Sequence, residues 1–263
     1  MTRTVRVRAS SLAELFDCPA RFEAKHLLKM TGPSSGKALL GTAIHAGSAA
    51  FDQAVIDGSP ISAYDACEPL VDALRNPEYE VDWGDDKPDD AEAIGIKLLS
   101  KYCKEIAPFQ TYAAVEVTCD DLEITDLGLK LTGTADRIRI VDDEYGLSDL
   151  KSGGRAVGSD GRAVTSGHGA QLAVYELLAE QTFKKNMTLP AQIIGLQTSK
   201  SSPRVGLGEI PNVREMLIGT EEDPGLLHHA ARIIHSGSFF GNAKSMLCSA
   251  KFCPRYTTCK YRS

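Results

Sequence analysis

The sequence predicts an α/β protein in which a central mixed sheet is flanked by helices. Its 263 residues, 43% hydrophobic and 24% charged, suit one soluble globular domain with an added lobe. Helical and strand periodicities alternate along the chain in the order helix, three strands, helix, strand. The short, β-rich and turn-bounded segments that predict strands are 112–119, 129–141, 145–151 and 191–199.

The predicted helices follow from apolar spacing and from capping residues. Ser10 and Ser11 precede the apolar stretch LAELF and are expected to cap the first helix, because serine hydroxyls accept hydrogen bonds from the free N–H groups of a helix start. In the second helix, Leu40, Ile44 and Phe51 recur at helical spacing. The helices predicted after the first are 37–55, 61–75, 89–106, 169–183 and 211–235.

Two further segments lack both periodicities and are predicted to be loops. Residues 152–169 are rich in Gly and Ser, and the tail from Gly237 combines loop residues with cysteines. We therefore expect a single domain over 1–263. Its expected parts are a catalytic core at 37–210, a helical insertion at 56–110, and the chain ends 1–36 and 236–263 joined to each other as a metal-cluster region.

No apolar run approaches the ~20 residues that span a bilayer, and the N-terminal MTRTVRVRASS lacks the apolar core of a secretory signal. We expect a cytoplasmic protein with no membrane partner.

Charge is distributed unevenly along a chain whose net charge is −6. Residues 1–50 hold seven Lys and Arg against three acids, and residues 225–263 hold six against none. If the two ends meet, they form a patch with a net charge of about +10 that could bind the phosphates of a nucleic acid. The alternative is a set of solvated surface charges. The acidic run at 77–92 is expected to be a solvated loop leading into a helix.

Two carboxylates and an ammonium occupy neighbouring predicted strands. Along the first strand, Asp136 shares a face with Ile138, and along the second, Asp149 shares a face with Lys151. Buried carboxylates that lie close together repel unless a cation lies between them. A divalent metal ion held by Asp136 and Asp149, with Lys151 orienting or acidifying a water molecule, would resolve this. A buried Asp–Lys ion pair with the other Asp at a strand edge fits the pattern equally well.

Other polar residues are candidates for the same site. His45 lies on a predicted helix face made of small residues and could supply an imidazole ligand. Gln171 and Tyr175 lie one turn apart on the helix at 169–183, where they could hold the Lys151 region or a phosphate. Glu116 lies on a strand and has a weaker claim as an extra ligand or base. Each of these also fits an ordinary structural role.

Together these residues resemble the RecB-type branch of the PD-(D/E)XK nuclease superfamily. The resemblance rests on His45, Asp136, the Asp149-Leu150-Lys151 step and the QLAVY motif at 171–175. It implies a restriction-endonuclease-like α-β-β-β-α-β core. It also implies Mg²⁺ or Mn²⁺ bound by His45, Asp136, Asp149 and the Leu150 backbone carbonyl, with Lys151 assisting the water, and Gln171 and Tyr175 supporting the site.

The cysteines give a second signal. Seven are present, and an odd number without a secretion signal argues against a disulfide framework. We assign Cys67, Cys103 and Cys119 to packing. The remaining four comprise one residue after the first helix and three in a short C-terminal loop, an arrangement that an iron–sulfur cluster can use to clamp the chain ends together. These four are Cys18, Cys248, Cys253 and Cys259.

AddB-type and CRISPR-associated adaptation nucleases resemble this chain in their four cysteines, which implies a structural [4Fe–4S] cluster. Four residues separate Cys248 from Cys253, which departs from the commonest pattern of those proteins. Zn²⁺ is therefore an alternative occupant. Four unrelated free cysteines are a third, less favoured alternative.

The sequence thus predicts a Mg²⁺- or Mn²⁺-dependent DNA exonuclease that acts on single-stranded or end-containing duplex DNA. The resemblance implies phage or bacterial DNA recombination, repair or CRISPR adaptation, with proteins of those systems as partners and a ring-like homo-oligomer as one route to processivity. The alternatives are a non-catalytic DNA-binding or assembly module that keeps the nuclease fold, and a metal-dependent hydrolase of small phosphates, which leaves the basic ends unexplained.

Overall fold

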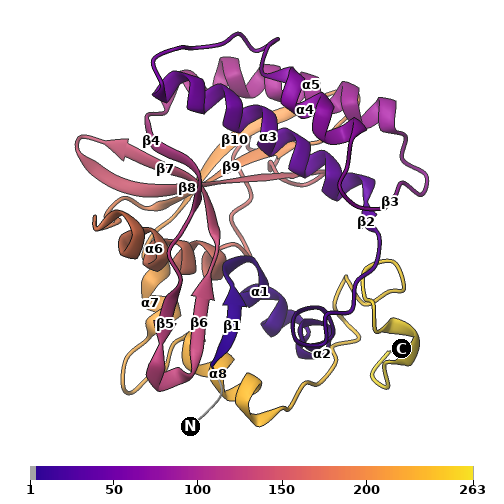
Figure 1. The fold of residues 1–263 in the computed structure, drawn as a ribbon, viewed down its shortest axis with the longest axis vertical. Helices are drawn as coiled ribbons and strands as arrows, with labels where there is room; N and C mark the ends of the chain where they lie inside the picture. The colour runs from indigo at the N-terminus through magenta and orange to yellow at the C-terminus, as the bar shows by residue number, and fades with distance from the viewer. Residues whose placement is uncertain (1–3, 263) are drawn as a thin grey trace.

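A five-stranded mixed sheet forms the centre of the computed structural model, which describes residues 4–262 (Figure 1). Its strands lie in the order β10-β9-β8-β7-β4, and every neighbouring pair is antiparallel except β8 and β9. The strands are β4 (Tyr112–Thr118), β7 (Thr134–Val141), β8 (Glu144–Gly153), β9 (Ala191–Gln197) and β10 (Arg204–Ile210). The parallel pair needs a crossover connection, which α6 (Gly169–Phe183) supplies over the predicted range. The predicted α/β architecture is confirmed.

Helices cover the sheet on two sides, each with its own apolar core. One core joins α3 (Gly36–Ile56), α4 (Cys67–Arg75) and α5 (Pro88–Glu105) to residues such as Ile194, and these helices form the upper layer in Figure 1. The second core joins the opposite face, including Ile193, to α6 and four other helices. Those helices are α1 (Ala9–Asp17), α2 (Pro19–Phe22), α7 (Val213–Ile218) and α8 (Leu226–Ser236). Ile193 and Ile194 belong to different cores because successive strand residues face opposite sides of a sheet.

A small second sheet lies beside the first and changes one prediction. Its strands lie in the order β1-β6-β5 and comprise β1 (Val5–Arg8), β5 (Leu122–Ile124) and β6 (Leu129–Thr132). The single strand predicted over 129–141 is therefore two strands, β6 and β7, in different sheets. The change of sheet occurs at Gly133, where an added Cβ would lie 2.6 Å from a Tyr175 ring carbon. A third, two-stranded sheet pairs β2 (Ser34–Ser35) with β3 (Val81–Asp82).

Three other predictions about helices need correction. Ser10 and Ser11 lie inside α1, whose N-cap is Arg8, and the Ser11 hydroxyl donates to the Arg8 carbonyl at 2.8 Å. The helix predicted at 211–235 is two helices, α7 and α8, because Gly219 takes a positive φ of 70° and packs against the backbone of Gly225. The helix predicted at 61–75 begins only at Cys67. Strands β1 and β10 were not among the predicted elements.

The two ends of the chain meet beside α2 (Pro19–Phe22), where the yellow C-terminal tail lies next to the indigo N-terminal helices in Figure 1. The amide of Ala20 donates to the Phe240 carbonyl at 3.0 Å, and the Asn242 side chain donates to the Asp17 carbonyl at 2.9 Å. A π-helical turn (Glu23–Leu27) follows α2, and a short 3-10 turn (Tyr256–Thr258) lies in the tail. Within residues 4–262, no helix is both long and apolar enough to cross a membrane.

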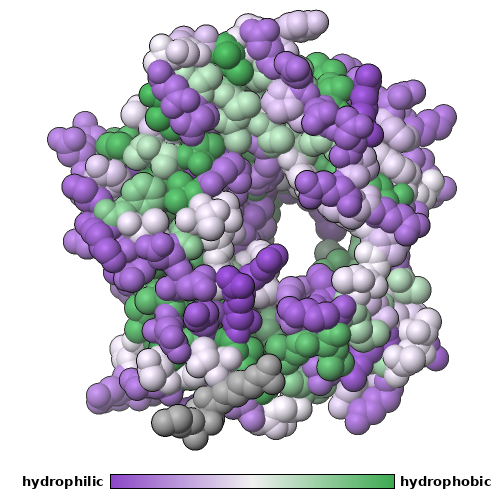
Figure 2. Space-filling view, viewed as in Figure 1, coloured by the Kyte–Doolittle hydropathy of each residue, from purple (hydrophilic) through white to green (hydrophobic). Residues whose placement is uncertain are grey.

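Figure 2 shows an opening through the molecule. In the same view, Figure 1 places this opening between α3 above and the α1–α2 pair below. The segment between α2 and β2 runs along its right-hand side. Helix α3, which forms the upper border of this opening, also carries His45.

Candidate active site

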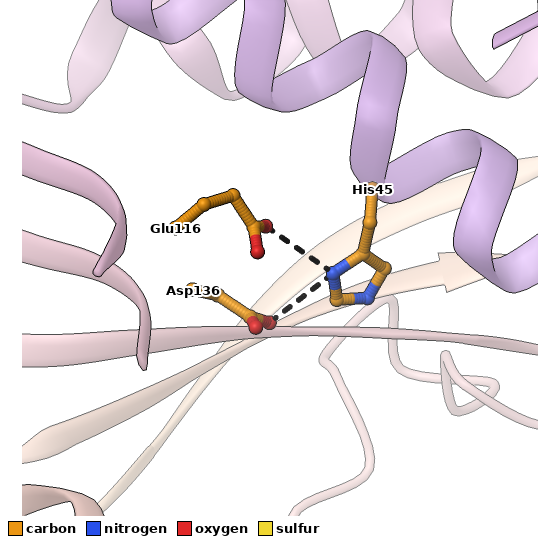
Figure 3. Close-up of side chains that lie close together, drawn as sticks. All are labelled: His45, Glu116 and Asp136. Carbon is orange, nitrogen blue, oxygen red and sulfur yellow. Dashed lines mark ion pairs between the residues drawn. The ribbon is translucent and has the colours of Figure 1, made fainter. Parts of the chain in front are cut away.

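Three ligating side chains converge between α3 and the main sheet (Figure 3). The register of β4 with β7 pairs Val115 with Arg137 and Val117 with Ala135, which places Glu116 directly opposite Asp136. His45 reaches down from α3, with its Nδ1 3.5 Å from Asp136 Oδ2 and 3.7 Å from Glu116 Oε1. Among the residues that the structure describes, these three form the one group whose ligand atoms all lie within 4.8 Å of one another.

Strand β8 adds Asp149, Leu150 and Lys151 to the same region. The Leu150 amide donates to Asp136 Oδ2 at 2.7 Å, and the Leu150 carbonyl accepts from His45 Nε2 at 3.1 Å. Lys151 Nζ lies 2.5 Å from Asp149 Oδ2. The paired strands β7 and β8 thus place both aspartates, the lysine and a backbone carbonyl around His45.

The electrostatics of this cluster favour a bound cation. Asp149 is 2% exposed, and burial together with repulsion by Asp136 raises its pKa to about 6 despite the neighbouring Lys151. Burial lowers the pKa of His45, but the carboxylates of Asp136 and Glu116 outweigh it and raise the pKa overall. Despite its contact with Lys151, Asp149 Oδ2 is buried without a well-directed hydrogen-bond donor from the described residues. A divalent cation ligated by oxygen and imidazole fits this donor set.

Helix α6 supports Asp149 from below the sheet. The Gln171 side-chain amide lies 3.4 Å from Asp149 Oδ1 and donates to the Tyr175 hydroxyl at 3.3 Å. Tyr175 is 7% exposed, and burial raises its pKa well above the usual value, so that its hydroxyl keeps its proton. All the site residues predicted from the sequence therefore lie in one continuous group, including Glu116, whose positive φ of 48° is uncommon for a residue other than glycine.

A buried ion pair next to the cluster was not predicted. Arg137 is fully buried, donates through Nε to Asp52 at 2.7 Å, and donates to the Ser48 hydroxyl at 2.9 Å. It also donates to the Asp136 carbonyl at 2.8 Å, which ties α3 to the backbone of the active-site strand. One local signal for this pair is present in the sequence, because Ser48 and Asp52 lie one turn apart on a helix, on the face that continues from Ile44.

A family model described as the PD-(D/E)XK nuclease superfamily matches residues 6–262. The chain belongs to this superfamily. Members of this superfamily are nucleases that use divalent metal ions, so that the His45–Glu116–Asp136 group in this PD-(D/E)XK protein has the composition that such a reaction needs. No curated protein shows significant sequence similarity to the chain.

Solved structures also resemble this PD-(D/E)XK chain. Eleven chains match, among them one titled "Crystal structure of SSO0001", with 14% sequence identity and a TM-score of 0.44. That match covers 100% of this chain and 90% of the other.

The four cysteines predicted to bind a cluster line one narrow cavity in this PD-(D/E)XK protein. Cys18 comes from the junction of α1 and α2, and the other three come from the tail, namely Cys248, Cys253 and Cys259. The Cys18 sulfur accepts a hydrogen bond from the Asn242 amide at 3.4 Å. Of the three remaining cysteines, Cys103 and Cys119 are buried and Cys67 is half-buried, as expected for packing residues.

The basic patch is smaller than the sequence count suggests. Arg21 pairs with Glu14 at 2.7 Å, and Arg255 pairs with Glu23, so that these charges are neutralised at the junction of the two ends. In the tail, cations lie over aromatic rings instead: Lys251 over Phe252, Lys260 over Tyr261 and Arg262 over Tyr256. The acidic run at 77–92 is mostly exposed and leads into α5, as predicted.

Proposed function

We propose that this PD-(D/E)XK protein is a Mg²⁺- or Mn²⁺-dependent DNA exonuclease. The observation that carries the proposal is the convergence of His45, Glu116 and Asp136 beside the Asp149–Lys151 pair. Asp136, Asp149, His45 and the Leu150 carbonyl would hold the metal ion, which when bound supplies charge neutralisation and lowers the pKa of a water molecule. An end-dependent nuclease suits DNA recombination or repair, or CRISPR adaptation, in a bacterial cell or a phage-infected host.

The protein's own side chains have separate tasks in this proposal. Lys151, whose ammonium is anchored by Asp149 at 2.5 Å, orients the attacking water and stabilises the hydroxide that it becomes. Gln171 holds the Asp149 carboxylate in place from α6. Glu116, opposite Asp136, can add a further ligand or accept the proton of the water.

Two features support DNA as the substrate and an end-dependent mode of cleavage. Exposed aromatic and basic residues alternate in the tail, an arrangement that binds single strands through stacking and phosphate contacts. The opening in Figure 2 is closed on all sides in that view, so a strand could enter it only by an end. We therefore expect linear single-stranded DNA to be cut and a covalently closed circle of the same sequence to resist.

The four cysteines are proposed to hold a structural [4Fe–4S] cluster. Their position around one cavity supports a shared occupant. Zn²⁺, which four thiolates can also hold in a tetrahedral site, is the alternative occupant.

The deciding experiment is a time course on end-labelled linear and circular DNA with Mn²⁺ or Mg²⁺, using anaerobically purified protein. Asp136→Ala, Asp149→Ala and Lys151→Ala should each lower the cleavage rate by about 10²-fold or more while the circular dichroism spectrum is unchanged. EDTA is the control for metal dependence. Wild-type rates in any variant would remove that residue from the mechanism, and cleavage of the circle would exclude obligate entry by an end.

An absence of cleavage by wild-type protein that retains its iron would favour the non-catalytic DNA-binding module. The burial of Asp136 and Asp149 close enough to repel each other argues against that function, because unused buried charges lower stability.

A further inference from the structure

Arg21 is a buried residue of the cysteine cavity, and one nitrogen of its guanidinium has no partner. It lies on α2, is only 5% exposed, and lines the cavity together with the four cysteines. Its Nη1 atom is buried and donates to no acceptor within residues 4–262. Buried polar atoms are nearly always hydrogen-bonded. A buried donor without an acceptor, beside four thiols, therefore indicates a ligand of the cavity that can accept from it.

The other edge of the Arg21 guanidinium is held by two carboxylates of α1. Arg21 Nε donates to Glu14 Oε1 at 2.7 Å, and Arg21 Nη2 lies 3.5 Å from Asp17 Oδ2. Because Nε and Nη2 share one edge of the planar guanidinium, these contacts leave Nη1 on the other edge. Arg21 can therefore donate to a third acceptor and keep both carboxylates.

Glu14, which anchors Arg21, is held in its charged form. Burial favours the neutral acid, but hydrogen bonds from His26 and Lys25, together with the charges of Lys25 and Arg21, lower the pKa of Glu14 to about 2. Lys25 Nζ and His26 Nε2 each lie 3.1 Å from Glu14 Oε2, whereas Arg21 uses Oε1. Replacing Glu14 by glutamine would thus remove the charged anchor and leave the guanidinium itself in the protein.

Other donors are directed at the sulfur atoms of the same cavity. The Asn242 amide donates to Cys18 Sγ at 3.4 Å. Burial raises the pKa of the Cys253 thiol, and the Arg255 amide and the Arg21 guanidinium offset part of that rise. The positive charge of Arg21 therefore lies close enough to act on a sulfur atom. Together these groups stabilise negative charge on the cysteines.

Ser249 supplies a second buried donor without an acceptor. Its hydroxyl makes no hydrogen bond to any residue that the structure describes. Ser249 directly follows Cys248, which lines the cavity, and its carbonyl accepts from the Cys253 amide at 2.9 Å. A donor from α2 and a donor from the tail thus lie unsatisfied beside one set of four thiols.

An anionic metal centre is the ligand that such donors fit. Cysteines bind iron or zinc as thiolates, so four of them with a [4Fe–4S]²⁺ core or with Zn²⁺ carry a net charge of about −2. A buried negative charge destabilises the protein unless cations and N–H donors compensate it. Arg21 and Arg255 both line the cavity, but Arg255 is partly exposed and pairs with Glu23. Arg21 is the buried cation that can meet this charge.

We propose that Arg21 compensates the negative charge of the metal centre held by the four cysteines. Its guanidinium donates through Nη1 to the loaded site, and its positive charge slows the loss of the metal. In a [4Fe–4S] centre the same charge raises the reduction potential, because reduction adds a further negative charge. This role rests on the proposed four-cysteine site, holds for iron and zinc alike, and gives Arg21 no part in DNA cleavage.

The test follows the release of metal from loaded, full-length protein to an excess of chelator under anaerobic conditions. Arg21→Gln should release metal roughly tenfold faster than wild type, as expected when a residue that contacts the metal ligands is lost. Glu14→Gln is the matched control, because it breaks the same ion pair but keeps the guanidinium, and its release should stay close to the wild-type rate. For an iron centre, a redox titration should give a lower midpoint potential in Arg21→Gln but not in Glu14→Gln.

Arg21→Lys keeps the test decisive if Arg21→Gln does not fold. The lysine retains the charge and can pair with Glu14, but it has no second nitrogen to donate into the cavity. Its release rate should therefore lie between the rates of wild type and Arg21→Gln. A wild-type rate in Arg21→Lys would overturn the proposal. Equal rates in Arg21→Gln and Glu14→Gln would also overturn it, since the ion pair alone would then explain the effect.

This proposal and the proposed nuclease function can fail separately. A loaded wild-type protein that does not cleave DNA would refute the nuclease function and leave the release rates readable. A wild-type protein that binds neither iron nor zinc would overturn the four-cysteine site and the role of Arg21, while DNA cleavage could still be measured.

Discussion

At the scale of single residues, Asp149 shows why the site favours a cation. Its side chain is 2% exposed and lies near a second carboxylate, and Lys151 Nζ, 2.5 Å away, neutralises part of the negative charge. A folded-state pKa of about 6, against an ordinary value of 3.8, means that ionised Asp149 destabilises the metal-free protein. The contribution of this residue to stability is favourable below pH 4, and is lost as the pH rises through about 6.

This shift predicts a pH-dependent effect of Asp149→Asn on metal-free protein. The variant should be more stable than wild type by about 3 kcal/mol above pH 7, because it removes the buried charge, and the difference should shrink towards zero near pH 4. Urea unfolding in EDTA at several pH values measures it. In Mn²⁺, the wild type should gain melting temperature and the variant should gain much less. A variant that is less stable than wild type at pH 8 in EDTA would contradict the prediction.

Residue types and spacing were sufficient to predict which residues lie together, because a carboxylate or a lysine in the middle of an apolar strand is conspicuous. The structure brings His45, Asp136, Asp149, Lys151, Gln171 and Tyr175 together as expected. The Arg137–Asp52 pair was not predicted, because its two members are 85 positions apart and each alone resembles a surface residue. Only the packing of α3 on β4 and β8 shows that Arg137 is buried.

At the scale of elements, the Arg137–Asp52 pair fixes α3 against the sheet. Arg137 is fully buried and Asp52 is 3% exposed, and the Tyr102 hydroxyl of α5 also donates to Asp52, at 2.6 Å. Burial raises the pKa of Asp52, while the carboxylate raises that of Arg137, so the guanidinium stays charged. Because His45 lies two turns before Asp52 on the same helix, this network sets the distance of the imidazole from Asp136.

Removing one member of this pair should destabilise the folded protein. Asp52→Ala leaves a buried guanidinium without its partner and should lower the free energy of unfolding by about 3–5 kcal/mol. Asp57→Ala, at the exposed end of the same helix, is the control and should change it by less than about 0.5 kcal/mol. Urea denaturation measures both, and cleavage assays below the unfolding transition should show a slower Asp52→Ala enzyme. Equal stability of the two variants would show that the pair does not hold α3.

Helices and strands were predicted correctly where the local sequence pattern determines the structure. They were predicted incorrectly where contact with a distant segment determines it. Helix α6 and strand β8 carry strong periodicity and lie at or near their predicted ranges. The break at Gly133 depends on the ring of Tyr175, which is 42 positions away, and β1 forms because its residues pair with β6. Neither contact leaves a local signal in the sequence.

At the scale of the whole molecule, the cysteine cavity joins the two chain ends. Cys18 follows α1, whereas its three neighbours in the cavity lie in a tail with little regular structure. Such a tail has few buried apolar residues of its own, so a bound cluster would supply much of its stability. The sequence predicted which four cysteines meet, because three lie in one short segment and the fourth follows a helix near the other end of the chain.

Loss of one ligand should therefore remove iron and stability together. Cys18→Ser and Cys253→Ser should each lose bound iron and visible absorbance, and each should lower the melting temperature. Cys67→Ser, a half-buried thiol outside the cavity, is the control and should keep its iron. Iron quantification and thermal unfolding under anaerobic conditions measure the effect. Full iron content in either ligand variant would refute the four-cysteine site, and zinc in place of iron in the wild type would identify the other occupant.

The joining of the two ends also determines the order in which this chain can fold during synthesis. The segment from α3 to β10 contains the main sheet and can become compact as soon as residue 210 has left the ribosome. Cys18, in contrast, must wait for Cys259, which is synthesised 241 residues later, and strand β1 must wait for β6. Helix α1 packs against α6 and can therefore be secured before the tail is made, whereas α2, whose Ala20 amide donates to the Phe240 carbonyl, completes its packing only after the tail has left the ribosome.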